Sequence, residues 1–391
     1  MSENAENFET WIRSDFVEMN TALENLYFAQ ERREHVEGVG DAIKQQICTE
    51  GHEFVVRLLA EGNTDEGFDN AFDLLGDLGL YLAALRRHEL TNHAREEKSP
   101  FPEASALGLQ IAASIGMAPR FSTAHLATRN AAKEGRQKSF TSLKDEYLFL
   151  DFNTRSIFAF MRAADALTRI LPLGVSHPVT ETLLEDAANA LKDVIKYNEM
   201  LYDALDTDRF FYSVRPYYKP YRVGRQEYRG ANAGDFSGIN EIDLLLGLCQ
   251  ANDPYYAQLL VDKMLFMTPE DQASLRDCMR RRSLLAQFLD VAEGSATAPW
   301  FKRNGAAFLE VCRLHGATAA QHHDRLVKSF IEKPSAALEA DKLAQVTASG
   351  PPLPVLMRAL ETLRDMRLAA DRADIKTSYT EIQALKAYVD R

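Results

Sequence analysis

The segment WIRSDFVEMNTALENLYFA, residues 11–29, decides the fold class that we expect for this chain. Its apolar residues recur at steps of three to five positions, which places them on one face of an α-helix. These residues are Trp11, Phe16, Met19, Leu23 and Leu26. A half-buried strand would instead alternate apolar and polar residues at every second position. We therefore predict a helix here.

The same periodicity returns along the rest of the chain. It follows SHPVTET from Leu184 to Leu205, and it returns in residues 356–367. In TPEDQASLRDCMRRRSLLAQFLDVA, Thr268 is a suitable N-cap and Pro269 suits the first helical position. Alternating strands are nearly absent from the sequence, so we predict an all-α, multi-helix bundle.

Two polar stretches suggest how the helices are grouped. They cover residues 95–108 and 131–146 and have the composition of loops. We expect an N-terminal helical region, residues 1–130, and a larger C-terminal helical domain, residues 131–391. Both could pack as one domain.

Composition and charge limit the classes of function. The 391 residues are 46% hydrophobic and 26% charged, which is typical of a soluble globular protein. A net charge of −12 argues against broad nucleic-acid binding. The four cysteines are far apart, and no signal peptide or membrane-spanning run is evident. We expect a cytoplasmic protein that binds neither nucleic acid nor membrane.

One segment departs from the helical, acidic character of the chain. RPYYKPYRVGRQEYRGANAGD, residues 215–235, holds four tyrosines, four arginines and a lysine within its first fifteen residues. Prolines and glycines interrupt it, so we expect it to be non-helical. It could bind a nucleic-acid strand or form a pocket for a small anionic aromatic ligand. It could also be a structural loop whose arginines pair with surplus acids.

Three of the nine histidines fall in HGATAAQHHDRLVKSFIEKP, residues 315–334. On an α-helix, His323 shares one apolar face with Leu326, Val327, Phe330 and Ile331. A neutral imidazole in an apolar slot suits an axial haem ligand, and it equally suits a buried histidine bonded to a backbone carbonyl. His322 and His315 would lie together on a more exposed side. The sequence contains no HExxH, no zinc-type cysteine and histidine spacing, no GxSxG and no phosphate loop.

Taken together, the two stretches resemble the haem-dependent tryptophan/indoleamine 2,3-dioxygenase superfamily. The paired phenylalanines before Arg215, the Tyr- and Pro-rich segment, RVGRQEYRG, AGD and LLLGL carry the resemblance, and so does HHDRLVKSFIEKP. It is nearest to the monodechloroaminopyrrolnitrin synthase branch. The similarity covers roughly residues 80–350. It implies a haem-dioxygenase-like helical bundle that binds b-type haem between helices.

The resemblance also implies roles for individual residues. His323 matches the proximal haem ligand, and Arg215 matches the arginine that binds the substrate carboxylate. Phe210 and Phe211 match aromatic residues beside the substrate ring. The other expected substrate contacts are Tyr217, Ala233 and Ser349.

Two departures from the family pattern affect these expectations. The family's propionate-binding arginine, three residues before the proximal histidine, is Ala320 here, so we expect Arg313 or Arg325 in its place. The Gly-Thr-Gly-Gly loop of the dioxygenases has only partial counterparts in VTASGPPLP, among them Ser349. This departure argues against ring-cleaving 2,3-dioxygenation.

The function implied is that of a haem-dependent oxygenase acting on an aromatic amino acid, L-tryptophan or a derivative. Arg215 would hold the substrate so that its ring lies over haem-bound oxygen, and the oxidant would be dioxygen or peroxide. Cleavage, hydroxylation and rearrangement of the ring all remain open, and a homodimer is expected by analogy. The alternative is a non-catalytic helical protein that binds nucleic acid or an acidic partner through residues 215–230.

Overall fold

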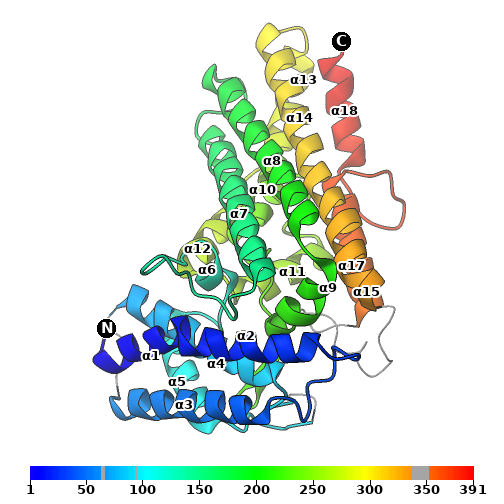
Figure 1. Ribbon diagram of the computed structural model, residues 1–391. Coiled ribbons are helices and arrows are strands. Elements are labelled where there is room, and N and C mark those ends of the chain that lie inside the picture. Colours follow the sequence, from blue (N-terminus) through cyan, green and yellow to red (C-terminus); the bar gives the residue numbers. More distant parts are fainter. Residues whose placement is uncertain (63–66, 93–94, 336–351) are drawn as a thin grey trace. The chain divides into compact units, whose positions relative to one another are not determined.

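The computed structural model describes residues 1–62, 67–92, 95–335 and 352–391, and it confirms the all-α class (Figure 1). The α-helices are α1 Glu3–Arg13, α2 Asp15–Phe28, α3 Asp41–Ala60, α4 Phe68–Arg87, α5 Pro102–Ile115, α6 Thr123–Leu126, α7 Lys144–Ile170, α8 Val179–Ala204, α9 Thr207–Arg209, α10 Ser237–Leu246, α11 Pro254–Met264, α12 Pro269–Cys278, α13 Leu284–Ser295, α14 Pro299–Gln321, α15 Lys333–Ser335, α17 Leu353–Arg367 and α18 Tyr379–Val389. Other elements are the π-helices η1 Phe210–Val214 and η3 His322–Glu332, the 3₁₀-helix η2 Arg215–Tyr218, and the strands β1 Tyr221–Val223 and β2 Gln226–Tyr228.

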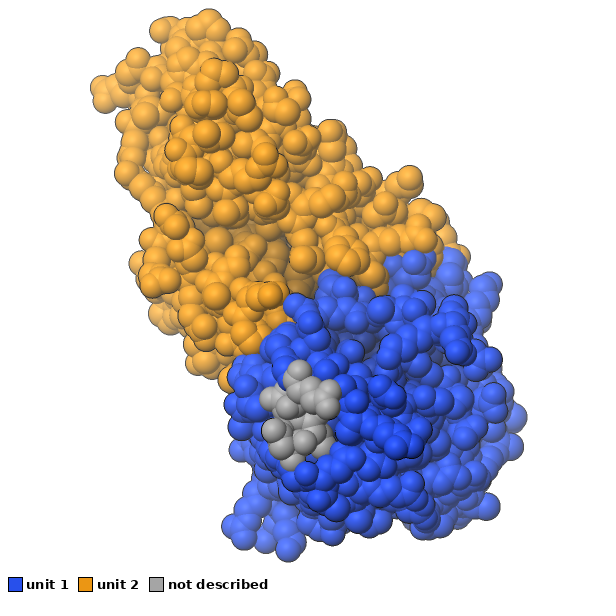
Figure 2. Space-filling view, turned by 90° about the vertical axis from the view of Figure 1, so that its left-hand side faces the viewer, with its two compact units in different colours: residues 1–151, 204–235, 330–353 blue, residues 152–203, 236–329, 354–391 orange. Residues whose placement is uncertain are grey.

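The chain forms two compact units, each assembled from separate segments (Figure 2). Unit 1 contains residues 1–151, 204–235 and 330–353, and unit 2 contains residues 152–203, 236–329 and 354–391. The boundary that we expected at residue 130 stays a prediction.

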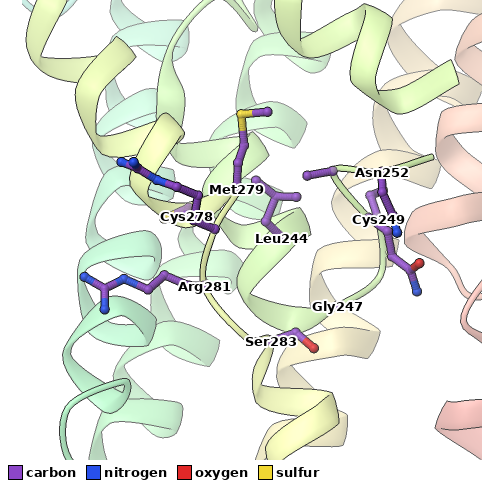
Figure 3. A pocket seen from close by; sticks show the side chains of 11 residues that line it. Leu244, Gly247, Cys249, Asn252, Cys278, Met279, Arg281 and Ser283 are labelled. Atoms are coloured by element: carbon purple, nitrogen blue, oxygen red, sulfur yellow. The ribbon is translucent and has the colours of Figure 1, made fainter. Parts of the chain in front are cut away.

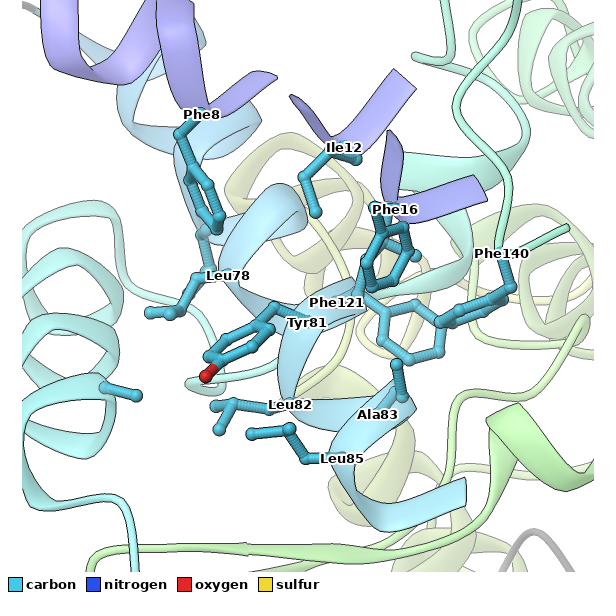
Figure 4. Close-up of a cluster of buried hydrophobic side chains, with 14 of the residues drawn as sticks. Phe8, Ile12, Phe16, Leu78, Tyr81, Leu82, Ala83, Leu85, Phe121 and Phe140 are labelled. Carbon is cyan, nitrogen blue, oxygen red and sulfur yellow. The ribbon is translucent and has the colours of Figure 1, made fainter. Parts of the chain in front are cut away.

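The core of unit 1 is built around α4, which is buried on nearly every side from Ala71 to Arg87. Side chains from α1 and α2, including Phe8 and Phe16, pack onto it in Figure 4. Gly51 of α3 permits a close approach, because a Cβ atom there would lie 2.2 Å from the Tyr81 ring. The N-terminal helices therefore form one apolar core.

A small hairpin lies within the Arg- and Tyr-rich segment. β1 and β2 are antiparallel, with Tyr221 opposite Tyr228 and Val223 opposite Gln226. Gly224 takes the first position of the two-residue turn with a φ of 59°. Only glycine adopts this conformation without strain, so the sequence fixes the turn.

The long helices of unit 2 are joined by side-chain bonds. Ser156 of α7 donates to Asn198 of α8 over 3.3 Å, and Asn198 donates to Gln321 of α14 over 3.1 Å. α14 continues directly into η3. Among the described residues, no helix is long and apolar enough to cross a membrane.

Candidate functional site

Two phenylalanines and an arginine are brought together by a π-helical turn in unit 1. The backbone N–H of Arg215 donates to the carbonyl of Phe210, five residues earlier, which defines η1. Phe210 and Phe211 are both buried. The Arg215 guanidinium lies over the Phe211 ring, 5.5 Å from its centroid. π-helical turns often occur at functional sites.

Two of the four other cations of residues 215–235 pair with acids of the same segment. Arg229 holds Asp235 through two bonds of 2.9 Å and 2.8 Å. Arg222 lies 3.7 Å from Glu227 on the facing strand. The structural-loop interpretation therefore holds for these two arginines.

Arg215 differs from them because its side chain is buried and has no counter-ion among the described residues. Only 7% of the residue is exposed, and its guanidinium makes no hydrogen bond or ion pair with the described part of the chain. Burial alone lowers the pKa of Arg215 to about 10. A desolvated guanidinium is a strong site for a carboxylate, which it can bind through two parallel bonds.

His323 lies at the start of η3 in unit 2, directly after α14. It is 5% exposed, and its Nδ1 has no hydrogen-bond partner among the residues described. Burial lowers its pKa below the ordinary value of 6.5, so the ring is neutral at pH 7. Val327 and Phe330 are buried as predicted, whereas Leu326 and Ile331 are half-buried. The expected α-helix is a π-helix, which changes the spacing of residues on this face.

His322 has a different environment from that of its neighbour. Its side chain is exposed to solvent, yet desolvation lowers its pKa to about 4. The exposure describes the surface of the ring, which water reaches. The lowered pKa reflects the densely packed protein farther from the ring. His322 is therefore the natural control for any role assigned to His323.

Residues 2–389 match the family model described as monodechloroaminopyrrolnitrin synthase PrnB. The chain belongs to the PrnB family. This family is part of the haem-dependent tryptophan/indoleamine dioxygenase-like superfamily, so the chain is a haem-dependent oxygenase that acts on a tryptophan-derived substrate.

The residues of this PrnB family member fit a haem ligand at one position. A buried neutral imidazole with an unbonded ring nitrogen is what axial ligation needs, and His323 supplies it. Propionate partners are less well matched. Arg313 is exposed and bound to Glu310 by two 2.7 Å bonds, and Arg325 lies 3.7 Å from Asp203. Their cofactor role stays a prediction.

The remaining predicted site residues of this PrnB family member are Tyr217, Ala233 and Ser349. The Tyr217 ring stacks on Phe140 at 4.4 Å within the core of unit 1, and Ala233 is half-buried in the turn between Asn232 and Asp235. Ser349 lies outside the described residues. Arg215 belongs to unit 1 and His323 to unit 2, and each is described within its own unit.

A buried polar cluster centred on Asp243 was not predicted from the sequence. His315 lies 2.7 Å from its Oδ1, Arg367 donates to both oxygens over 2.8 Å and 2.7 Å, and Tyr256 donates over 2.7 Å. The expected exposed side for His315 is wrong, because it is 0% exposed. Asp243 sits in the largely apolar run NEIDLLLGL, where the two acids Glu241 and Asp243 were the available signal.

Unit 2 also contains a cavity of about 580 Å³ (Figure 3). Its lining includes Leu244, Cys249, Asn252, Cys278, Met279 and Ser283. Neither His322 nor His323 is among the lining residues. Both cysteines are buried, and burial raises the pKa of each thiol, so they act as small apolar groups.

Proposed function

We propose that this protein is a haem b oxygenase in which Arg215 binds the carboxylate of L-tryptophan or a close derivative. The isolation of the buried Arg215 guanidinium carries the proposal. A buried charge that lacks a partner is costly unless a ligand supplies one. Phe210 and Phe211 would contact the aromatic part of the same ligand.

In this proposal His323 holds the haem iron through its unbonded imidazole. Bound haem supplies the redox chemistry, with dioxygen or peroxide as oxidant. The chain itself contributes orientation and exclusion of water. Arg215 fixes one end of the substrate by two directed bonds, and the buried phenylalanines keep the ring end dry.

The nucleic-acid alternative has little support from the segment itself. Arg229 and Arg222 are engaged with neighbouring acids, and Arg215 is too buried to reach a strand. The aromatic rings of the segment also pack in the core, because Tyr217 and Tyr221 are each only 1% exposed. A stacking platform for single strands needs exposed rings.

The ligand assignment is tested by the absorption spectrum of protein supplied with haem during expression. We expect a strong Soret band in the wild type, its loss or shift in His323→Ala, and its recovery on adding imidazole. His322→Ala is the matched control and should keep the wild-type band. Loss in His322→Ala with retention in His323→Ala would overturn the assignment.

The carboxylate site is tested by calorimetric titration of the ferric holoprotein without oxidant. L-Tryptophan and tryptamine differ only by the carboxylate. We expect the wild type to prefer L-tryptophan by at least roughly tenfold, because a charge-assisted bidentate pair contributes about 1.5–3 kcal/mol. Arg215→Met should abolish the preference, while the exposed control Arg225→Met should retain it. Equal binding of both ligands by the wild type would contradict the proposal.

A further inference from the structure

The position of Arg215 depends on a turn that cannot complete its own hydrogen bonds. In a π-helix the carbonyl of residue i accepts from the N–H of residue i+5. For Phe211 that residue is Pro216, which has no N–H, so the π-helical bonds end with the one from Arg215 to Phe210. Tyr212 lies in η1, three residues before Arg215, and its carbonyl comes after this last bond. Its carbonyl accepts from a donor outside the turn.

Arg87, the last residue of α4, supplies this donor. Its Nη2 donates to the Tyr212 carbonyl over 2.9 Å. The same guanidinium binds both carboxylate oxygens of Glu24 in α2, each over 2.7 Å. It also lies over the Tyr27 ring, 4.9 Å from the centroid. Arg87 and Glu24 are 7% and 0% exposed.

This arrangement leaves the guanidinium little freedom to move. A bidentate pair fixes the plane of an arginine, and the ring covers one face of it. The neighbouring residues of the turn are held by the same helix, since Arg209 bonds to Asn25 of α2. The Tyr212 carbonyl is thus attached to a rigid part of the core of unit 1.

We propose that Arg87, oriented by Glu24, is a positioning residue for Arg215. By fixing the Tyr212 carbonyl, it holds η1 in the π-helical geometry that directs the Arg215 guanidinium toward a carboxylate. A lysine at residue 87 could not replace it, because a single ammonium group cannot match both Glu24 oxygens and the carbonyl in one plane. The inference rests on the proposed role of Arg215.

The test uses a double variant that leaves no charge unpaired. Glu24→Leu/Arg87→Met removes the ion pair and the donor to Tyr212 together, and apolar replacement of a buried pair usually preserves the fold. Calorimetry with the holoprotein compares L-tryptophan with tryptamine. We expect the preference for L-tryptophan to fall about tenfold, with tryptamine binding unchanged, because only the carboxylate contact is misplaced.

A matched control separates positioning from general stability. Asp77→Leu/Lys138→Met removes another buried ion pair of unit 1, whose charged atoms lie 2.7 Å apart, and leaves the bond from Arg87 to Tyr212 in place. It should retain the preference for L-tryptophan.

Each contrary result has a distinct meaning. If the wild type shows no preference, the proposed function fails. If the wild type and Arg215→Met behave as proposed but the double variant keeps the full preference, only the inference about Arg87 fails. Equal weakening of both ligands by the double variant, or the same loss of preference in Asp77→Leu/Lys138→Met, would also overturn it.

Discussion

A single side chain, Arg215, carries a buried charge, which the protein without a ligand does not favour. Its guanidinium is removed from water, and burial lowers its pKa from 12.5 to about 10. Arg120 of the same unit is also buried, but it donates to the carbonyls of Phe121 and Arg229 and stacks on two rings. The two arginines therefore differ in hydrogen bonding, and this difference supports the carboxylate proposed for Arg215.

Replacing Arg215 should therefore stabilise the protein when no ligand is bound. Because the folded pKa is depressed, the charged group costs folding free energy at every pH below about 10. We expect Arg215→Met to raise the free energy of unfolding by about 1–3 kcal/mol. Urea unfolding at pH 7 measures the change. Arg225→Met, at an exposed position, should leave stability unaltered, and a less stable Arg215→Met protein would count against this view.

Among the elements, α10 connects the other helices of unit 2 through Asp243. One carboxylate accepts from His315 of α14, Arg367 of α17 and Tyr256 of α11. It is 0% exposed, so within the described residues these partners are what compensates its charge. α14 leads directly into η3, and the cluster therefore anchors the base of the helix that carries His323.

Loss of the Asp243 charge should destabilise unit 2 strongly. Asp243→Asn would leave Arg367 buried without its anion, a change that typically costs about 3–5 kcal/mol. We expect a large fall in the thermal midpoint, measured by circular dichroism. A matched control is Asp277→Asn, because Asp277 makes an exposed pair with Arg281 that contributes about 0–1 kcal/mol. Similar midpoints for the two variants would refute the anchoring role.

The Asp243 carboxylate should also determine how much stability the protein loses at acid pH. Arg367 and His315 hold the pKa of Asp243 below its usual 3.8, although burial alone would raise it. A carboxyl group whose pKa is lower in the folded than in the unfolded chain stabilises the fold above the unfolded pKa. This stabilisation is lost as the pH falls below about 4. Wild type should therefore lose more stability than Asp243→Asn between pH 4 and pH 2.5. Urea titrations at these pH values test this, and parallel curves would contradict it.

The sequence predicted the helical stretches better than the short breaks within them. The Thr268 cap is confirmed, since its side chain accepts from the Asp271 N–H. The helix predicted over residues 11–29 is two helices that meet at Ser14, and the apolar pattern continues across the break. The stretch starting at Thr268 likewise divides into α12 and α13. Periodicity reports which face is buried, but it is insensitive to a short interruption that keeps the face.

The candidate site was predicted in part for a similar reason. The roles of Arg215 and His323 came from the resemblance. The structure adds that both are buried, and that the Arg215 guanidinium and the His323 Nδ1 have no hydrogen-bond partner among the described residues. The Asp243 cluster and the Glu24–Arg87–Tyr212 chain join helices far apart in sequence. Such contacts depend on packing, which local patterns do not encode. Pro216 was visible as a helix breaker, but the bond from Arg87 to the Tyr212 carbonyl was not.

At the scale of the whole molecule, the two units are interleaved along the chain. Unit 1 and unit 2 each consist of three segments, which alternate from the N-terminus to the C-terminus. Residues 204–235, which carry Arg215, come between two segments of unit 2. Neither unit is a continuous stretch that could be produced by a single truncation.

Interleaving predicts that the units unfold together. The chain has two tryptophans, Trp11 in unit 1 and Trp300 in unit 2. The variants Trp300→Phe and Trp11→Phe therefore report one unit each by fluorescence. We expect their urea midpoints to coincide with each other and with circular dichroism, which is the signature of one cooperative transition. Separated midpoints would show that the units are independent.

The dependence of Arg215 on Arg87 has an evolutionary consequence. Arg87 at the end of α4 and Glu24 in α2 hold a turn that lies more than a hundred positions later in the chain. A lineage that lost the arginine would leave Glu24 buried without its cation, so selection should keep or lose the two together. Glu24, Arg87 and Arg215 should therefore covary among relatives. Recruitment of the scaffold to a ligand without a carboxylate should release all three at once.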